Sequence, residues 1–138
     1  MATYNKFQSF VEYLAEGVCN FQTDQLTVAL TTNANAPSAS LDLVLTDIIE
    51  IAYTNLSSRD ITTSSSSQTG GTYSYVPTDL TLNATGAVAT FRWVVIYDNT
   101  PTSPADPLIA YFDYGADVTL ANGESFTLDF GTELFTIV

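Results

Sequence analysis

The sequence of 138 residues contains no histidine and only three cationic side chains, Lys6, Arg59 and Arg92. Histidine is the commonest general base and the commonest metal ligand, so its absence removes the usual centre of acid–base and zinc chemistry. A single cysteine, Cys19, excludes an intrachain disulfide, and we expect it to be a buried small hydrophobic residue. We therefore expect a non-enzymatic chain with no cofactor and no metal.

Three scattered cations cannot supply the clustered Lys and Arg contacts that nucleic-acid phosphates require. Asp and Glu number fifteen, which gives a formal net charge of −12, so an anionic membrane surface would repel the chain. No apolar run approaches the ~20 residues of a transmembrane helix. The N-terminal segment MATYNKFQSF lacks the basic-then-apolar layout of a signal peptide. We expect neither a nucleic acid nor a membrane as partner.

Hydrophobic residues are nevertheless 46% of the chain and aromatics 12%, whereas charged residues are 13%. Because charged residues are about half their usual share, the polar surface must consist largely of Ser, Thr and Asn. Thr suits the pleated surface of a strand because it is β-branched. Composition and length therefore predict one well-packed, β-rich domain that spans residues 1–138.

The N-terminal segment predicts a helix within residues 1–17. Four apolar residues recur at the i, i+3, i+4, i+7 spacing of one helical face: Phe7, Phe10, Val11 and Leu14. Thr3 or Asn5 can cap its start, and Gly17 can end it. Such a helix either covers the core of the sheet or docks against a neighbouring subunit, and both alternatives are open at this stage.

Residues 24–138 show the alternation and turn signals of strands. The predicted strands cover residues 26–30, 48–53, 61–67, 73–76, 80–83, 91–97, 108–114, 118–120, 126–130 and 134–138. Segment 48–53 leaves a helix as the alternative to a strand. Asn122-Gly123 predicts a hairpin between the strands on either side of it. Without helical crossovers, the order predicts a mainly β, jelly-roll-like antiparallel β-sandwich with one short N-terminal helix.

Oxygen ligands cluster where Asp113 and Asp117 precede Asn122 and Glu124. Calcium accepts carboxylate, amide and carbonyl oxygens, but the Asp-x-Asp-x-Asp-Gly pattern of a calcium loop is missing. Turn formation by Asp and Asn explains the same residues, so we favour turns over calcium. With fifteen carboxylates present, a pair that suits a glycosidase would arise by chance and carries no weight.

Aromatic and cationic residues leave two further alternatives. Tyr73, Tyr75 and Tyr97 could form a sugar-binding platform, whereas Trp93 lies in the most hydrophobic strand, where core burial is usual. We expect each of the two arginines, Arg59 and Arg92, to form an ion pair with a carboxylate. Arg59, in the polar segment SSRD, favours contact with a partner, whereas Arg92, beside Trp93, favours an internal ion pair.

The order of elements resembles a family of small tailed-bacteriophage virion proteins that decorate or cement the capsid. The resemblance lies in five segments: FQSFVEYLAEG, DQLTVALTTNANAPSAS, TDIIEIAYTNLSSRDIT, VVIYDNT and PLIAYFDYG. Related chains often carry His in the gap after the helix, where this chain has Cys19, so that position has no expected role beyond packing.

The resemblance implies a viral structural protein that binds the outer surface of a tailed-phage capsid and stabilises contacts between capsomers. It implies the major capsid protein as partner, a homotrimer, and a place on the capsid exterior of the virion after assembly in the host cytoplasm. The alternative is a head- or tail-fibre module that binds a host-surface glycan. The candidate interface residues are Phe7, Phe10, Leu14, Asn55, Arg59, Asp60, Pro101 and Pro104.

Overall fold

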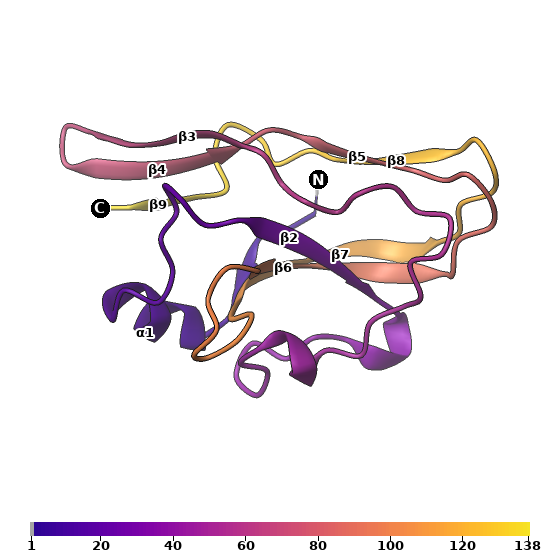
Figure 1. The fold of residues 1–138 in the computed structure, drawn as a ribbon, viewed down its shortest axis with the longest axis horizontal. Coiled ribbons are helices and arrows are strands. Elements are labelled where there is room, and N and C mark those ends of the chain that lie inside the picture. Colours follow the sequence, from indigo (N-terminus) through magenta and orange to yellow (C-terminus); the bar gives the residue numbers. More distant parts are fainter. Residues whose placement is uncertain (1) are drawn as a thin grey trace.

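The computed structural model describes residues 2–138 and arranges nine strands and one short α-helix as a two-layer β-sandwich (Figure 1). Every pairing between these strands is antiparallel. The predicted mainly β sandwich with one short helix is therefore confirmed. Neither the α-helix nor the 3₁₀ helices of residues 2–138 combine the length and hydropathy that a membrane span requires.

The first layer is a four-stranded sheet in the order β1-β7-β6-β2. Its strands are β1 (Asn5–Lys6), β7 (Leu108–Val118), β6 (Phe91–Asp98) and β2 (Leu26–Thr31). The inner strand β6 and the edge strand β2 have the sequences FRWVVIYD and LTVALT, which are rich in the β-branched and aromatic residues that strands favour.

The second layer contains two smaller sheets. One has the order β3-β4-β9, with β3 (Thr63–Thr69), β4 (Thr72–Pro77) and β9 (Phe135–Ile137). The other pairs β5 (Leu80–Asn83) with β8 (Ser125–Leu128). In Figure 1 the two sheets lie end to end above the first layer. The predicted strands 61–67 and 73–76 correspond to β3 and β4, which form a hairpin with Gly70-Gly71 at its turn.

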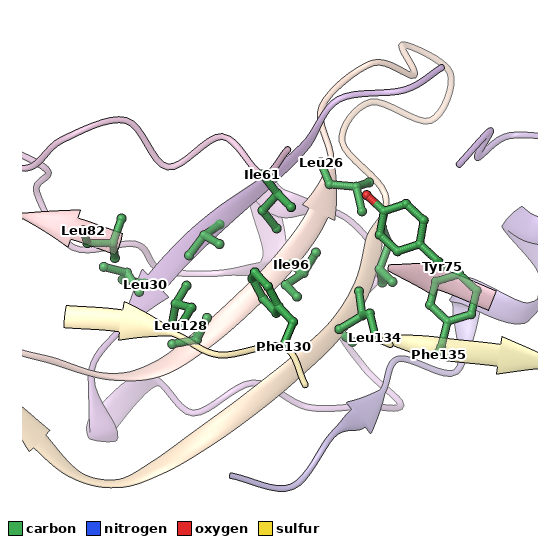
Figure 2. Close-up of a cluster of buried hydrophobic side chains, with 14 of the residues drawn as sticks. Leu26, Leu30, Ile61, Tyr75, Leu82, Ile96, Leu128, Phe130, Leu134 and Phe135 are labelled. Atoms are coloured by element: carbon green, nitrogen blue, oxygen red, sulfur yellow. The ribbon is translucent and has the colours of Figure 1, made fainter. Parts of the chain in front are cut away.

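The main core lies between the layers. Figure 2 shows Leu26, Leu30 and Ile96 of the first layer in one buried cluster with Leu82 and Leu128 of the second. All five side chains are at least nine-tenths buried. Because side chains alternate across a strand, the intervening residues of β2 and β6 point to the opposite face.

A second, smaller core covers that opposite face of the first sheet. It consists of Phe7, Ala29, Ile48, Val95, Tyr97 and Leu108. Ile48 comes from the segment that follows the 3₁₀ helix η2 (Leu45–Asp47). The predicted strand over residues 48–53 is wrong: this segment packs over the sheet, and its strand-like pairing with β2 is limited to one isolated bridge, Thr31 to Glu50. Ile48 covers the second core, whereas Ile51 and Tyr53 pack against the main core.

The predicted helix is present as α1 (Ser9–Ala15), with Gly17 in a left-handed conformation (φ +76°) after it. The predicted caps are wrong, because Asn5 pairs with Tyr111 in the sheet and Gln8 occupies the cap position. Phe10 packs on Phe21 and Phe135, with ring centroids 5.6 and 5.5 Å away. The helix therefore covers one end of the core, and its docking against a neighbouring subunit stays a prediction.

The turn at Asn122-Gly123 forms, with Gly123 at φ +85°, but it does not close a hairpin. β7 continues through Val118 into what was predicted to be a separate strand, and β8 pairs with β5 instead. The predicted hairpin is wrong because the turn carries the chain from one layer of the sandwich to the other, where β5 supplies the pairing partner.

Candidate docking surface

One long side of the sandwich is open. On this side β1 is the edge strand of the first sheet, and β9 is an edge strand of the three-stranded sheet in the second layer. Two apolar cavities lie along this side, and both are lined by Tyr4 and Leu134. We call this continuous depression the edge groove.

The first cavity of the edge groove has a volume of about 580 Å³. Its apolar lining comes from both layers: Tyr4, Val94, Phe112, Phe126, Leu128 and Phe130. Tyr114, in the outer, more exposed half of β7, is 55% exposed at the cavity wall. The Tyr114 ring packs edge-on against Phe126, with centroids 5.1 Å apart. This wall is apolar, exposed and ordered by its own ring contacts.

The second cavity, of about 730 Å³, lies between α1 and β9. Val11 on the helix is 52% exposed and Ile137 on β9 is 40% exposed, and both line it. Large apolar side chains that remain exposed beside a sheet edge are typical of a contact surface for another molecule.

The charges at the edge groove are mostly negative. Asp129 and Glu133 line the first cavity and are exposed, and Lys6 in the second cavity is the one cation among the lining residues described. Burial raises the pKa of Tyr4 to about 12, so its hydroxyl is neutral at physiological pH. The edge groove therefore offers apolar walls, a neutral phenol and an acidic rim.

Hydrogen bonds fix the segment between β8 and β9 that forms one side of the edge groove. The Phe130 amide donates to the Asp79 carboxylate over 3.0 Å, and the Gly131 amide donates to Asp129 over 2.8 Å. The Leu134 amide donates to the Tyr75 carbonyl over 2.8 Å. The segment is held at both ends, so the groove is preformed.

The eight candidate interface residues do not gather in one place. Phe7 and Phe10 are buried in the second and main cores, and Leu14 is half-buried. Phe7 faces a different core from Phe10 because it precedes the helix and continues the β1 pairing, where its amide donates to the Ile109 carbonyl. Only Phe10 and Leu14 of the eight line the edge groove.

Asn55, Arg59 and Asp60 make contacts within the chain. The Asn55 side chain donates to the Ala87 carbonyl, and Asp60 accepts a hydrogen bond from Thr27 on β2. β2 is the end of the first sheet opposite β1, so Asp60 lies away from the edge groove.

Arg59 lies flat over the Tyr53 ring, 3.6 Å from its centroid, and forms an ion pair with Glu50 over 3.8 Å. Its guanidinium also donates to the Val28 carbonyl. These contacts hold Arg59 against β2 and the adjoining segment, and its role at an interface stays a prediction.

Pro101 and Pro104 are half-buried in the loop between β6 and β7. Thr100, in the same loop, accepts a hydrogen bond from the Gln25 amide over 2.8 Å. This contact places the loop beside the start of β2, away from the edge groove. The interface role of these two prolines stays a prediction.

Arg92 forms the predicted internal ion pair. Its two nitrogens contact the Asp113 carboxylate over 2.8 and 3.1 Å. The hydrogen bonds from Arg92 hold the pKa of Asp113 below its ordinary value. Asp113 also accepts from the Gly115 amide, and Glu124 accepts from Ala121 in its turn, which supports turn formation for both residues. Within residues 2–138 no three acidic or cysteine side chains come together as a metal site.

The tyrosines proposed for sugar binding are not gathered on the surface. Tyr75 and Tyr97 are buried, and the Tyr73 hydroxyl is hydrogen-bonded to Ser66 over 2.8 Å. Among the aromatic residues of the described range 2–138, Tyr114 alone is largely exposed, and it lies at the edge groove. Trp93 is half-buried, rather than part of the main core.

A buried acidic residue lies away from the edge groove. Asp98, at the end of β6, is fully buried; one of its oxygens accepts from the Thr100 amide over 3.2 Å and the other has no hydrogen-bond partner among the described residues. Burial, and then contact with Asp24, raises the pKa of Asp98 to about 7. Cys19 is buried as expected, and burial raises the pKa of its thiol to about 12.

Sequence reasoning did not identify the main residues of the edge groove, although one signal points to them. Phe112 and Tyr114 are two positions apart on β7 and therefore share a face. Aromatic residues that continue on one face beyond the buried half of a strand indicate an apolar surface.

No protein-family model, no curated protein and no solved structure matches this chain.

Proposed function

We propose that this chain is a non-enzymatic structural protein of a tailed-bacteriophage particle. It binds the outer surface of the capsid and stabilises contacts between capsomers. The observation that carries the proposal is the edge groove, a preformed apolar surface beside an unpaired sheet edge on a strongly acidic molecule. The element order that resembles phage decoration proteins supplies the identity of the particle.

The charge of the chain suits this function. A net charge of −12 keeps free copies apart before assembly, and complementary charge steers them to a cationic patch on the capsid lattice. The apolar walls of the edge groove then supply the binding free energy, since burial of apolar surface is the main favourable contribution to association.

The proposal includes self-association as a trimer, as the resemblance implies. Trimer contacts must be mainly apolar and hydrogen-bonded, because each copy brings twelve net negative charges. Sedimentation equilibrium of the purified chain measures the oligomeric state directly. A monomer at all concentrations in the presence and absence of capsids contradicts the trimer, without bearing on capsid binding itself.

Cosedimentation tests the proposal. The purified chain is mixed with capsids assembled from the major capsid protein of the same genome. We expect saturable binding at a fixed ratio to the capsid protein, and a higher disruption temperature for decorated capsids. Absence of the chain from the capsid pellet at every ratio contradicts the proposal.

A matched pair of variants locates the contact. Tyr114→Ser with Ile137→Ser removes two exposed apolar side chains from the edge groove. Leu41→Ser with Ile49→Ser removes two exposed apolar side chains from elsewhere, 77% and 65% exposed. We expect the first pair to weaken capsid binding and the second to leave it unchanged. Equal effects would show that the contact lies outside the edge groove.

A further inference from the structure

We propose that the edge groove binds an extended cationic peptide segment of the partner protein, which adds to β9 as a new strand and inserts an apolar side chain into the first cavity. This inference rests on the proposed function, because it names the chemistry of the partner at the same docking surface. The bound peptide is an extended strand with alternating apolar residues. It carries Lys or Arg near the apolar side chain that enters the first cavity.

The backbone of β9 supports strand addition. β9 pairs with β4 on one side only and is the last strand of its sheet. The Leu134 amide points to β4, where it donates to the Tyr75 carbonyl. Thr69 and Thr72 pair next to the two-residue turn, so the backbone groups of Tyr73 and Tyr75 point away from β3 and toward β9. Their partners Ile137 and Phe135 therefore point to β4, and the amide and carbonyl of Thr136 between them point away from it. An extended peptide gains main-chain hydrogen bonds at such an edge.

The residues that line the edge groove favour an extended peptide over a helical one, with one apolar side chain of the peptide in the first cavity. The second cavity lies directly between α1 and β9, so a strand paired with β9 contacts Val11 on its other side. The first cavity continues this path and reaches Val94 and Leu128 of the main core. A large apolar side chain in such a desolvated pocket is typical of the dominant residue of an interface.

Charge complementarity determines the composition of the peptide. Asp129 and Glu133 are exposed at the first cavity, and the whole chain carries a net charge of −12. Lys and Arg beside the apolar anchor therefore meet opposite charge. A second copy of this chain brings the same negative charge, and its own Lys6 and two arginines do not offset it, which disfavours self-pairing as the occupant.

Selection from a display library of random dodecapeptides on the immobilised full chain tests the proposal. We expect enriched peptides with a net positive charge, alternating apolar residues and no internal proline. Each enriched peptide is then synthesised with single N-methyl groups along its backbone. Strand addition predicts that methylation at alternate amides abolishes binding and that methylation at the others does not. Failure to enrich peptides, or binding insensitive to every methyl group, overturns the proposal.

Two charge variants provide the matched comparison. Asp129→Asn with Glu133→Gln removes two carboxylates at the edge groove, and Asp42→Asn with Asp60→Asn removes two elsewhere; each new side chain keeps a carbonyl acceptor. For the first pair we expect about a fivefold weaker affinity for the enriched peptide at low salt, and for the second pair less than about a twofold change. Equal affinities for the wild-type chain and the groove variant overturn the proposed charge recognition.

The same variants separate this inference from the proposed function. Capsid binding that persists unchanged in the edge-groove variants refutes the peptide inference and leaves capsid decoration standing. Enriched cationic peptides together with no capsid binding by the wild-type chain refute capsid decoration and leave the peptide inference standing. Concentration-dependent self-association that Ile137→Ser abolishes identifies a second copy as the occupant and overturns the peptide inference.

Discussion

At the scale of single residues, the buried carboxyl group of Asp98 has the largest consequence for stability. Its folded-state pKa of about 7 lies above the ordinary value of about 3.9 for an unfolded Asp. The folded chain therefore holds this proton more tightly than the unfolded chain. The contribution of Asp98 to stability is greatest below about pH 4 and decreases as the pH rises to about 7, where it levels off.

We predict that Asp98→Asn stabilises the chain above pH 7 by about 1–3 kcal/mol, because no buried charge is then formed. The amide keeps the oxygen that accepts from Thr100. Urea unfolding of both chains between about pH 4 and 8 checks this, and their difference in free energy of unfolding should increase with pH. Asp117→Asn, at an exposed position, is the control for loss of one charge. A pH-independent difference between wild type and Asp98→Asn contradicts the prediction.

Arg59 makes contacts within the chain that stabilise the fold. Its planar group stacks on Tyr53, and Tyr53 in turn donates to Glu50 over 2.6 Å and accepts from the Leu30 amide over 2.9 Å. We predict that Arg59→Lys lowers the free energy of unfolding by about 1–2 kcal/mol, because a lysine keeps the charge and loses the stacking geometry.

Chemical denaturation of Arg59→Lys measures this loss, with Arg92→Lys as the comparison. Arg92 bonds to Asp113 at the surface, where ion pairs contribute little. The loss for Arg59→Lys should be the larger of the two. An equal or smaller loss would mean that the Tyr53 stack does not stabilise the fold.

At the scale of elements, Asn55 joins the segment before β3 to the turn after β5. The side chain of Asn55, itself at φ +67°, donates to the Ala87 carbonyl, and its own carbonyl accepts from the Thr85 amide. A Cβ at Gly86 would lie 2.5 Å from the Asn55 amide nitrogen. Glycine is therefore required at position 86 by this approach.

We predict that Gly86→Ala destabilises the chain by about 1 kcal/mol, because Asn55 must give up its hydrogen bond to Ala87. Asn55→Gly suits the positive φ and removes the obstructing side chain. In that background Gly86→Ala should cost less, which a double-mutant cycle of unfolding free energies measures. Additive effects of the two substitutions would contradict the steric explanation.

The sequence predicts those elements whose pattern is local. Alternation and β-branching identify β2 and β6, and Gly70-Gly71 identifies the β3–β4 turn. The pattern fails at Ile48, because an apolar residue that covers a sheet face has the same sequence signal as one within a strand. It also fails at Asn122-Gly123, since turn residues do not specify whether the flanking segments pair with each other.

The edge groove could be predicted only in part. The aromatic positions on β7 indicate an apolar face, but the groove also needs Tyr4 and Leu134, which are 130 residues apart in the chain and meet through sheet packing. The grouping of Phe7 with Phe10 fails for a related reason. Their spacing suits a helix, whereas the helix begins at Ser9 and leaves Phe7 in the strand pairing.

At the scale of the whole molecule, the net charge of −12 sets the response to salt. Repulsion among carboxylates favours expansion of the chain, and added ions screen it. We predict that the melting temperature rises by several degrees between about 20 and 500 mM NaCl. Calorimetry checks this, with KCl as a second salt. A fall in melting temperature in both salts would show that specific ion pairs outweigh the general repulsion.

The first sheet is covered on both faces, by the second layer on one and by the segment around Ile48 on the other. The amides of β6 are therefore protected from hydrogen exchange by a separate cover on each face of the sheet. We predict that the segment around Ile48 opens without separation of the two layers. The amides of residues 45–51 should therefore exchange through a local opening. Those of β6, which is paired on both sides, should exchange only when the whole molecule unfolds.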